Sequence, residues 1–227
     1  MPLLLVDLDN TLLDRESAFR TTAARLLAEV GAPESDLEWL IEADDDGHTS
    51  RYELADAIRL RYGLSITVVE IVEALREGVR RFSRLDPLVA CALDIAANAG
   101  WIPVIVTNGG AHQQEAKIRM TGLDQYVAEW VISEEAGVAK PDSRIFEIAA
   151  DRARMGLRGA WMIGDSPEAD IAGAANLGLP SVWLHRGRRW TEQRFAPTVT
   201  AGSIVAALAA VLDRAAAPAP ARAFSRR

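Results

Sequence analysis

Cysteine is almost absent from this sequence of 227 residues, in which Cys91 stands alone. A lone cysteine has no partner within the chain, which excludes a framework of intrachain disulfides and favours a reducing compartment. Long apolar runs are missing as well, because no segment approaches the roughly 18 apolar residues of a membrane span. The apolar run at 3–6 is too short for the core of a signal peptide and leads directly into charged residues. We therefore expect a soluble, cytoplasmic protein with no membrane partner.

Positive charge is in deficit. The 25 Lys and Arg residues face 32 Asp and Glu residues, which leaves a net charge of −7. A nucleic-acid-binding protein needs a basic face, so no nucleic acid partner is expected. The chain is 49% hydrophobic and 25% charged, as ordinary globular proteins are, which excludes a disordered or fibrous protein. At about 150 residues per domain, the length indicates one large domain or one domain that carries an insertion.

Helix signals dominate the first third of the chain. A buried strand is predicted over 3–8, and four helices follow it with no strand between them. These helices are predicted over 17–30, 34–43, 51–62 and 67–83. Capping boxes at Ser50-x-x-Glu53 and Thr67-x-x-Glu70 favour the last two, because a hydroxyl and a carboxylate can satisfy free backbone N–H groups at a helix start.

From residue 86 onward, helices and strands alternate. The predicted helices cover 88–99, 111–121, 142–155, 167–177 and 203–212, and the predicted strands cover 103–107, 127–132, 160–163 and 181–184. Such alternation is typical of an α/β fold with a doubly wound parallel sheet that helices cover on both faces. We therefore expect an α/β core at 1–14 and 86–213 with an inserted all-helical cap at 15–85. The remaining residues, 214–227, are rich in arginine, alanine and proline and are expected to form a flexible tail.

Polar side chains gather at the carboxyl ends of the predicted strands, where ligands bind in a parallel α/β sheet. They are Asp7 and Asp9 at the end of the first strand, Thr107, Asn108 and Gly109 at the end of the strand at 103–107, Lys140 before a helix, and Asp165, Ser166 and Asp170 after the strand at 160–163. Taken alone, an aspartate at a strand end or the loop at 107–110 is typical of a turn, Lys140 of a solvated lysine and Asp170 of a surface helix residue. Four such clusters at predicted strand ends are not expected of unrelated turns. We interpret them as a single site.

The acids of this site suit a phosphate ester as ligand. Asp7 and Asp165 would form an all-oxygen site for Mg²⁺, which prefers hard oxygen ligands. The metal would offset the repulsion between the Asp7 carboxylate and an anionic phosphate, so that the carboxylate could attack phosphorus. Asp9 would protonate the leaving oxygen and later deprotonate the attacking water.

The remaining polar groups suit the phosphoryl oxygens. Thr107 and the backbone amides of Asn108 and Gly109 would hold these oxygens as negative charge spreads onto them. Lys140 would supply a compact positive charge to the nucleophile and the phosphate together. The sequence therefore predicts catalytic roles for Thr107 and Lys140 as well as for the two first-strand aspartates.

Four motifs of the chain resemble those of the haloacid dehalogenase (HAD) superfamily of phosphohydrolases, in the branch with a helical cap inserted after the first strand. The motifs lie at 7–12 (DLDNTL), 106–109 (VTNG), 140–141 (KP) and 164–171 (GDSPEADI). The resemblance implies that Asp7 is a nucleophile that forms an aspartyl-phosphate and that Asp9 is the general acid/base. It implies Mg²⁺ held by the Asp7 carboxylate, the Asp9 backbone carbonyl and Asp165. Ser166 and Asp170 would be auxiliary, and Asp170 would orient Lys140 or a metal-bound water.

The family resemblance also bears on strand order and reaction type. The strand that ends at Asp7 would lie between those that end at Thr107 and Asp165. The dehalogenases of this superfamily lack the second aspartate of the first motif, because a halide leaving group needs no proton. The presence of Asp9 therefore favours a phosphatase acting on a small phosphorylated metabolite.

Other functions remain as alternatives. One is a phosphomutase of the same fold, which would return the phosphoryl group to a sugar. A phospho-aspartate receiver module for signalling is disfavoured, because its phosphoacceptor follows a later strand and it has no long helical insertion. The intact motifs disfavour an inactive binding protein, and a monomer and a homodimer are both compatible with the sequence.

The predicted cap would close over the site and select the leaving group. The cap residues that could contact the substrate are Trp39, His48, Arg51 and Tyr52, and those outside the cap are His112, His185 and Arg186. For Trp39 the alternative is a place in the interior of the cap.

Overall fold

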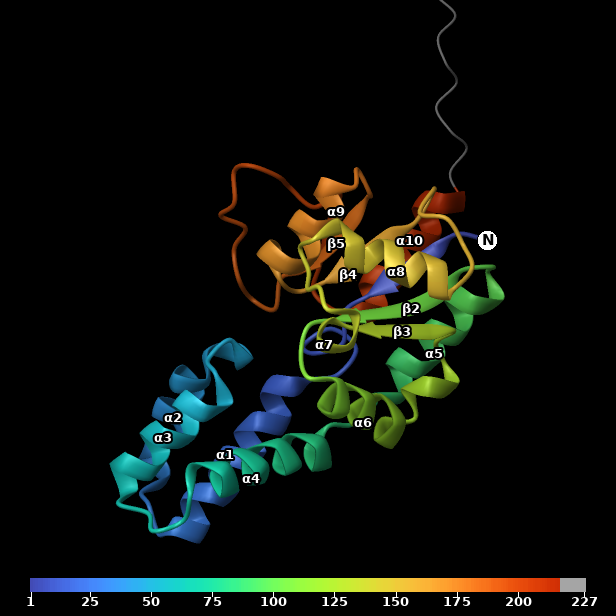
Figure 1. The fold of residues 1–227 in the computed structure, drawn as a ribbon. Helices are drawn as coiled ribbons and strands as arrows, with labels where there is room; N and C mark the ends of the chain where they lie inside the picture. The colour runs from blue at the N-terminus through green and yellow to red at the C-terminus, as the bar shows by residue number, and fades with distance from the viewer. Residues whose placement is uncertain (217–227) are drawn as a thin grey trace, which may run out of the picture.

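A six-stranded parallel sheet is the centre of the computed structural model, which describes residues 1–216 (Figure 1). The strands are β1 (Leu3–Val6), β2 (Ile102–Thr107), β3 (Glu129–Ile132), β4 (Trp161–Gly164), β5 (Ser181–Leu184) and β6 (Val199–Ala201). Their order in the sheet is β3-β2-β1-β4-β5-β6, and every neighbouring pair is parallel. The strand that ends at Asp7 therefore lies between those that end at Thr107 and Asp165, as the resemblance implied.

Helices cover both faces of this sheet. They are α5 (Pro87–Asn98), α6 (Ala111–Thr121), α7 (Ser133–Ala136), α8 (Ser143–Arg152), α9 (Ala172–Asn176) and α10 (Ile204–Ala216). Successive side chains of a strand point to opposite faces. Leu4 accordingly packs in a cluster with Leu93 of α5 and Leu208 of α10, whereas Leu5 packs in another cluster with Phe146 of α8. The predicted doubly wound α/β fold is confirmed.

Four helices between β1 and α5 form a separate group, coloured blue to teal in Figure 1. They are α1 (Arg15–Val30), α2 (Leu37–Asp44), α3 (Arg51–Tyr62) and α4 (Val68–Phe82), with 3₁₀ turns at Glu34–Asp36 and Asp45–Gly47. Their facing sides bury a hydrophobic cluster of their own, which includes Phe19, Leu40 and Ile58. A helix buries an apolar stripe against its neighbours, so this group needs no sheet to form a core.

Of the two capping boxes predicted for this group, one forms and the other does not. At α4, Thr67 N donates to Glu70 Oε2 at 2.7 Å and Thr67 Oγ1 accepts from Glu70 N at 3.2 Å, so the box is complete. At α3 the prediction is wrong, because the Ser50 side chain makes no capping hydrogen bond. Ser50 is exposed, so water can satisfy the free N–H groups there.

Three short elements differ from the predictions. The helix expected over 167–177 is divided into a π-helical turn (Pro167–Ile171) and α9, while α7 and β6 were not predicted. The predicted tail begins at 214, but α10 continues to Ala216, and the rest of the tail lies outside the described residues. Among the described residues, the structure contains no helix with the length and apolarity required to cross a membrane.

Candidate active site

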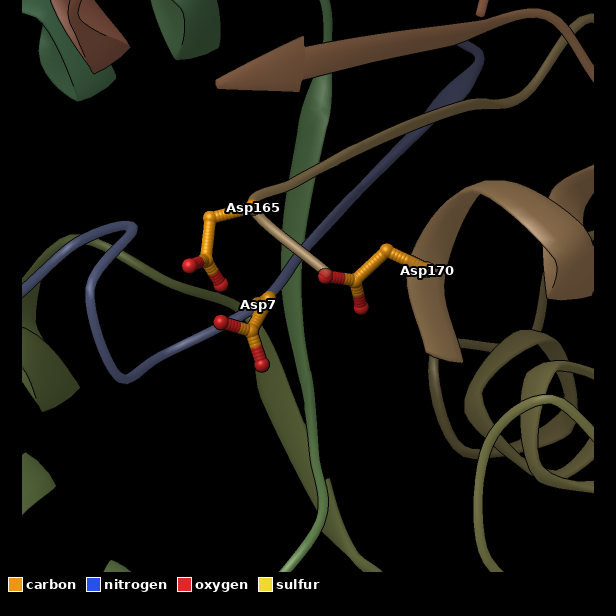
Figure 2. Close-up of side chains that lie close together, drawn as sticks. All are labelled: Asp7, Asp165 and Asp170. Carbon is orange, nitrogen blue, oxygen red and sulfur yellow. The ribbon is translucent and has the colours of Figure 1, made fainter. Parts of the chain in front are cut away.

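Three buried aspartates meet at the carboxyl edge of the sheet (Figure 2). Asp7 follows β1, Asp165 follows β4 and Asp170 lies in the π-helical turn. One carboxylate oxygen from each lies within 4.8 Å of the others. Because β1 and β4 are adjacent parallel strands, with Val6 opposite Ile163, the residues that follow them lie side by side. The structure thus brings together the three acids that the sequence placed at strand ends or one turn beyond.

The loop after β4 is shaped by the close approach of Asp170 to Gly164. A Cβ atom on Gly164 would lie 2.1 Å from Asp170 Oδ2, so only glycine fits at this position. Ser166 N donates to the same Oδ2 at 3.0 Å. The Ser166 hydroxyl accepts from Ala169 N at 3.1 Å and so caps the turn. The local role of Ser166 is therefore to hold the turn that carries Asp170.

Lys140 neutralises part of this acidic cluster. Its Nζ donates to Asp7 Oδ1 at 2.7 Å, to Asp170 Oδ1 at 2.7 Å and to the Val106 carbonyl at 2.6 Å. All three protons of the ammonium are thereby engaged. Burial lowers the pKa of Lys140, but the carboxylates of Asp170 and Asp7 outweigh burial and hold this pKa above its usual value. Lys140 is therefore a permanent cation of the site.

One ammonium does not balance three carboxylates. Burial, opposed by Lys140 and reinforced by Asp170 and Asp165, raises the pKa of Asp7 to about 8. Burial and the charge of Asp170 raise the pKa of Asp165 to about 6, although Arg188 donates to its Oδ2 at 3.0 Å. Excess negative charge with donor atoms that are all oxygens fits a hard divalent cation such as Mg²⁺. The residues present therefore suit the metal that the family resemblance implies.

Asp9 has a different set of partners, both from α6. Lys117 Nζ donates to Asp9 Oδ1 at 2.8 Å and to Oδ2 at 2.6 Å, and Gln114 Nε2 donates to Oδ2 at 3.0 Å. Burial raises the pKa of Asp9, but Lys117 and Gln114 outweigh it and hold this pKa below its usual value. Burial lowers the pKa of Lys117, against the opposing effect of Asp9. Lys117 and Gln114 were not predicted from the sequence. Their spacing of three residues, which puts them on one face of the helix, was the available signal.

The loop after β2 is held by several hydrogen bonds. The Thr107 hydroxyl accepts from Gln114 Nε2 at 2.7 Å. The Asn108 side chain pairs with the Lys140 backbone, donating to its carbonyl at 3.0 Å and accepting from its N–H at 2.9 Å. Gly109 N donates to Ser133 Oγ at 2.9 Å, so this amide is engaged within the protein. Ser133 is a further residue that the sequence analysis missed. That Thr107, Asn108 and Gly109 hold a phosphoryl group stays a prediction.

A cavity of about 460 Å³ is lined both by these groups and by the helical segment at 15–85. Its lining includes Asp7, Asp9, Thr107, Lys140 and Asp165 from the sheet edge, and Asp46, Gly47 and His48 from the helical segment. Asp46 accepts from Asn10 Nδ2 at 2.6 Å and from Arg186 Nη1 at 3.1 Å. These bonds tie the loop after α2 to the rim of the cavity. The sheet edge and the helical segment at 15–85 therefore both contribute residues to the site.

Apart from His48, the other residues that the sequence suggested as substrate contacts do not line this cavity. Arg51 pairs with Asp44, a buried carboxylate that also accepts from Arg15 Nη2 at 2.9 and 2.7 Å. Tyr52 is 52% exposed. Trp39 is partly buried and packs against the hydrophobic cluster of the helical segment, edge-on to another aromatic ring with the two centroids 6.2 Å apart. His112 is absent from the lining of the cavity, and the His185 ring accepts from a neighbouring backbone N–H at 2.9 Å.

The sheet and the side chains at its carboxyl edge define an α/β protein with an acidic, lysine-paired site. A family model for haloacid dehalogenase-like hydrolases matches residues 1–178, so the chain belongs to this family of hydrolases. The family membership expected from the four sequence motifs is confirmed.

Individual relatives within the family differ in how much of the chain they match. The chain is 42% identical over 101 residues to the pyrimidine 5′-nucleotidase YjjG of Escherichia coli, covering 44% of this chain and 45% of that protein. It is 32% identical over 135 residues to a phosphoserine phosphatase of Thermus thermophilus, covering 60% and 54%. The matched part is about half the length of these relatives. The structure of the HAD-hydrolase YfnB from Bacillus subtilis, bound to magnesium, has a TM-score of 0.74 at 23% identity, covering 93% of this chain and 98% of that one.

Proposed function

We propose that this hydrolase removes the phosphoryl group from a small phosphorylated metabolite through an aspartyl-phosphate on Asp7. One observation carries the proposal: Asp7 and Asp9 line the same cavity, and each is paired with its own buried lysine. A nucleophile and a separate acid/base two residues apart in the sequence suit phosphoryl transfer to a carboxylate. The nucleotidase and phosphatase named above, each of which matches part of this chain, support a phosphate ester as substrate.

In the first half-reaction, an Asp7 carboxylate oxygen forms a bond to phosphorus while the ester P–O bond breaks. Asp9 enters this step in its protonated form, although Lys117 and Gln114 favour its ionised form, and it gives its proton to the departing ester oxygen, which leaves as an alcohol. Lys140, 2.7 Å from Asp7, orients the attacking carboxylate and offsets charge on the phosphoryl group. Thr107 lies in the same cavity and holds a phosphoryl oxygen.

In the second half-reaction, a water molecule attacks the phosphorus of the aspartyl-phosphate. Asp9 takes a proton from this water as the new P–O bond forms, and the bond between phosphorus and Asp7 breaks. Inorganic phosphate leaves, and Asp7 returns to its carboxylate form. Each half-reaction therefore restores the protonation state of Asp9 that the other one requires.

The residues that would hold Mg²⁺ are the Asp7 carboxylate, the Asp9 backbone carbonyl and Asp165. When bound, the ion would offset the repulsion between the Asp7 carboxylate and the phosphate dianion. The helical segment at 15–85 acts as the cap in this proposal, because its loop with Asp46 and His48 lines the cavity together with the residues of the sheet edge.

Hydrolysis of 4-nitrophenyl phosphate by the purified full chain tests this function. We expect turnover with Mg²⁺, its loss on addition of EDTA, and a fall of more than about 10³-fold for Asp7→Asn, because the nucleophile is removed. Full activity of Asp7→Asn would overturn the proposal. A panel of phosphorylated metabolites, compared by kcat/KM, then identifies the substrate. Stimulation by a bis-phosphorylated sugar with little net release of phosphate would indicate the phosphomutase instead.

A further inference from the structure

Lysine is rare in this chain, which contains 23 arginines but only two lysines, Lys117 and Lys140. Both lysines are buried, with 6% and 5% of their surface exposed. Each pairs with one of the two aspartates that follow β1. An ammonium is a compact charge with three rotatable donors, whereas a guanidinium is a wider planar fork. The chain therefore uses the compact cation only at these two positions beside the cavity.

The contacts of Lys117 and Gln114, both from α6, hold the Asp9 carboxyl group at both of its oxygens. Oδ2 accepts two hydrogen bonds, from Lys117 Nζ at 2.6 Å and from Gln114 Nε2 at 3.0 Å. Oδ1 accepts one, from Lys117 Nζ at 2.8 Å, among the residues whose side chains the structure describes. A carboxylate oxygen has two lone pairs, so Oδ2 is saturated and Oδ1 keeps one. Oδ1 is therefore the oxygen with a lone pair free to take up a proton.

Gln114 also joins this carboxyl to the loop after β2. Its Nε2 donates to Thr107 Oγ1 at 2.7 Å and lies 3.3 Å from the Asn108 carbonyl. Gly109 has a φ of +142°, and a Cβ atom there would lie 3.1 Å from Gln114 Cγ. Glycine thus permits the close approach of α6 that brings its buried face to Asp9. The acid/base group and the predicted phosphate loop share one hydrogen-bonded support.

We propose that Lys117 and Gln114 are positioning residues that aim Asp9 Oδ1 at the leaving-group oxygen of the substrate. The proposal rests on the proposed phosphatase function. An acid must lie within hydrogen-bond distance of the oxygen that it protonates, and a carboxyl held at both oxygens cannot rotate out of that position. The proton on Oδ1 then passes to the ester oxygen as its bond to phosphorus breaks, while Lys117 stays on the carboxylate that remains.

Such a role predicts a dependence on the leaving group. An acidic phenol departs readily as its anion, whereas a weakly acidic phenol needs a proton as the P–O bond breaks. Loss of the support for Asp9 should therefore harm substrates with poor leaving groups most. A residue that only stabilises the fold would affect both kinds of substrate by the same factor.

The experiment compares 4-nitrophenyl phosphate, with an acidic leaving phenol, and 4-methylphenyl phosphate, with a weakly acidic one. The quantity measured is kcat/KM, which reports the first half-reaction. For Lys117→Met we expect a fall of about 10²-fold with the methyl substrate and less than about tenfold with the nitro substrate, since general acid catalysis contributes about 10²–10⁴-fold. Gln114→Met should show a smaller split in the same direction.

Arg119→Met is the matched control, because this cation lies on the same helix but pairs with the exposed Glu115. It should leave both values of kcat/KM unchanged. Equal losses with both substrates in Lys117→Met would overturn the positioning role while leaving the phosphatase function intact. If Lys117→Met fails to fold, Gln114→Met decides, since it removes a neutral amide, and equal losses there overturn the proposal. Absence of hydrolysis by the unmodified protein would instead overturn the proposed function itself.

Discussion

Two lysine–aspartate pairs lie side by side in this site, yet their electrostatics are opposite. Asp7 and Lys140 lie among two further carboxylates, and burial with these neighbours raises the pKa of Asp7 to about 8. Asp9 faces Lys117 and a neutral amide, and its pKa lies below the usual value even though burial opposes this. The same two residue types thus differ in charge balance because of the number of acids around them.

Because the charge around the two pairs differs, the two pairs should respond differently to an added cation. On the Asp7 side three carboxylates surround one ammonium, and of these three Arg186 and Arg188 pair only with Asp165, so a further cation would relieve their repulsion. The Asp9 carboxylate is already paired with Lys117 within the protein. Bound cations are often the largest charges in a site and favour ionised carboxylates beside them. Loss of Lys140, addition of Mg²⁺ and displacement of Asp170 should therefore act on the first pair and leave the second unchanged.

Replacement of Lys140 should have the largest effect on stability. Lys140→Met leaves Asp7 and Asp170 buried without their shared cation, and removal of one partner of a buried ion pair costs about 3–5 kcal/mol. We expect that loss in the free energy of unfolding, measured by urea denaturation, together with equal losses of activity on the two aryl phosphates. If Lys140→Met instead lost more kcat/KM with 4-methylphenyl phosphate than with 4-nitrophenyl phosphate, as expected of Lys117→Met, the two lysines would not have separate roles.

Addition of Mg²⁺ should have the next largest effect. A ligand that binds only the folded state stabilises it by about 2.7 kcal/mol at 100 times its Kd, so Tm should rise with Mg²⁺. Asp165→Asn should abolish the rise, because it removes a carboxylate of the cation site. Asp9→Asn should keep most of it, since this variant retains the backbone carbonyl. If the rise in Tm were lost in Asp9→Asn and kept in Asp165→Asn, the cation would bind beside Asp9 and Lys117 and not beside Asp7 and Lys140.

Displacement of Asp170 should have the smallest effect. In Gly164→Ala the new Cβ atom would lie 2.1 Å from Asp170 Oδ2, so the carboxylate must move. Overpacking of this kind costs about 1–3 kcal/mol in the free energy of unfolding, measured by urea denaturation. Gly156→Ala is the matched control, because its Cβ atom would have no neighbour within 4 Å. Equal stability of the two variants would mean that the contact between Gly164 and Asp170 is not close.

Strand ends were the most predictable feature of this protein. Short apolar runs with polar residues directly after them indicated β1, β2 and β4, and parallel strands place their carboxyl ends at one edge. Asp7, Thr107 and Asp165 could therefore be assigned to one site before any contact was known. The helix predicted over 51–62 matches α3 at both ends, because its start is polar and Gly63 adopts the left-handed conformation that ends it.

The partners of Asp9 were less accessible to this reasoning. Helix α6 is mostly polar, so its pattern does not indicate which face is buried. Gln114 and Lys117 belong to the buried face only because α6 packs against the segments that follow β1 and β2, where they bond to Asp9 and Thr107. The missing capping hydrogen bond of Ser50 also depends on the tertiary structure. A capping sequence permits this bond, but exposure to water removes the need for it.

Local sequence established the α/β class, the parallel sheet and the acids at its edge, because these depend on periodicity over a few residues. Packing over long separations established which cation serves which acid. Lys117 is 108 residues from Asp9 and Lys140 is 133 residues from Asp7. No local pattern encodes such pairs, because they form only when helices and loops settle on the sheet and exclude water from the charges between them.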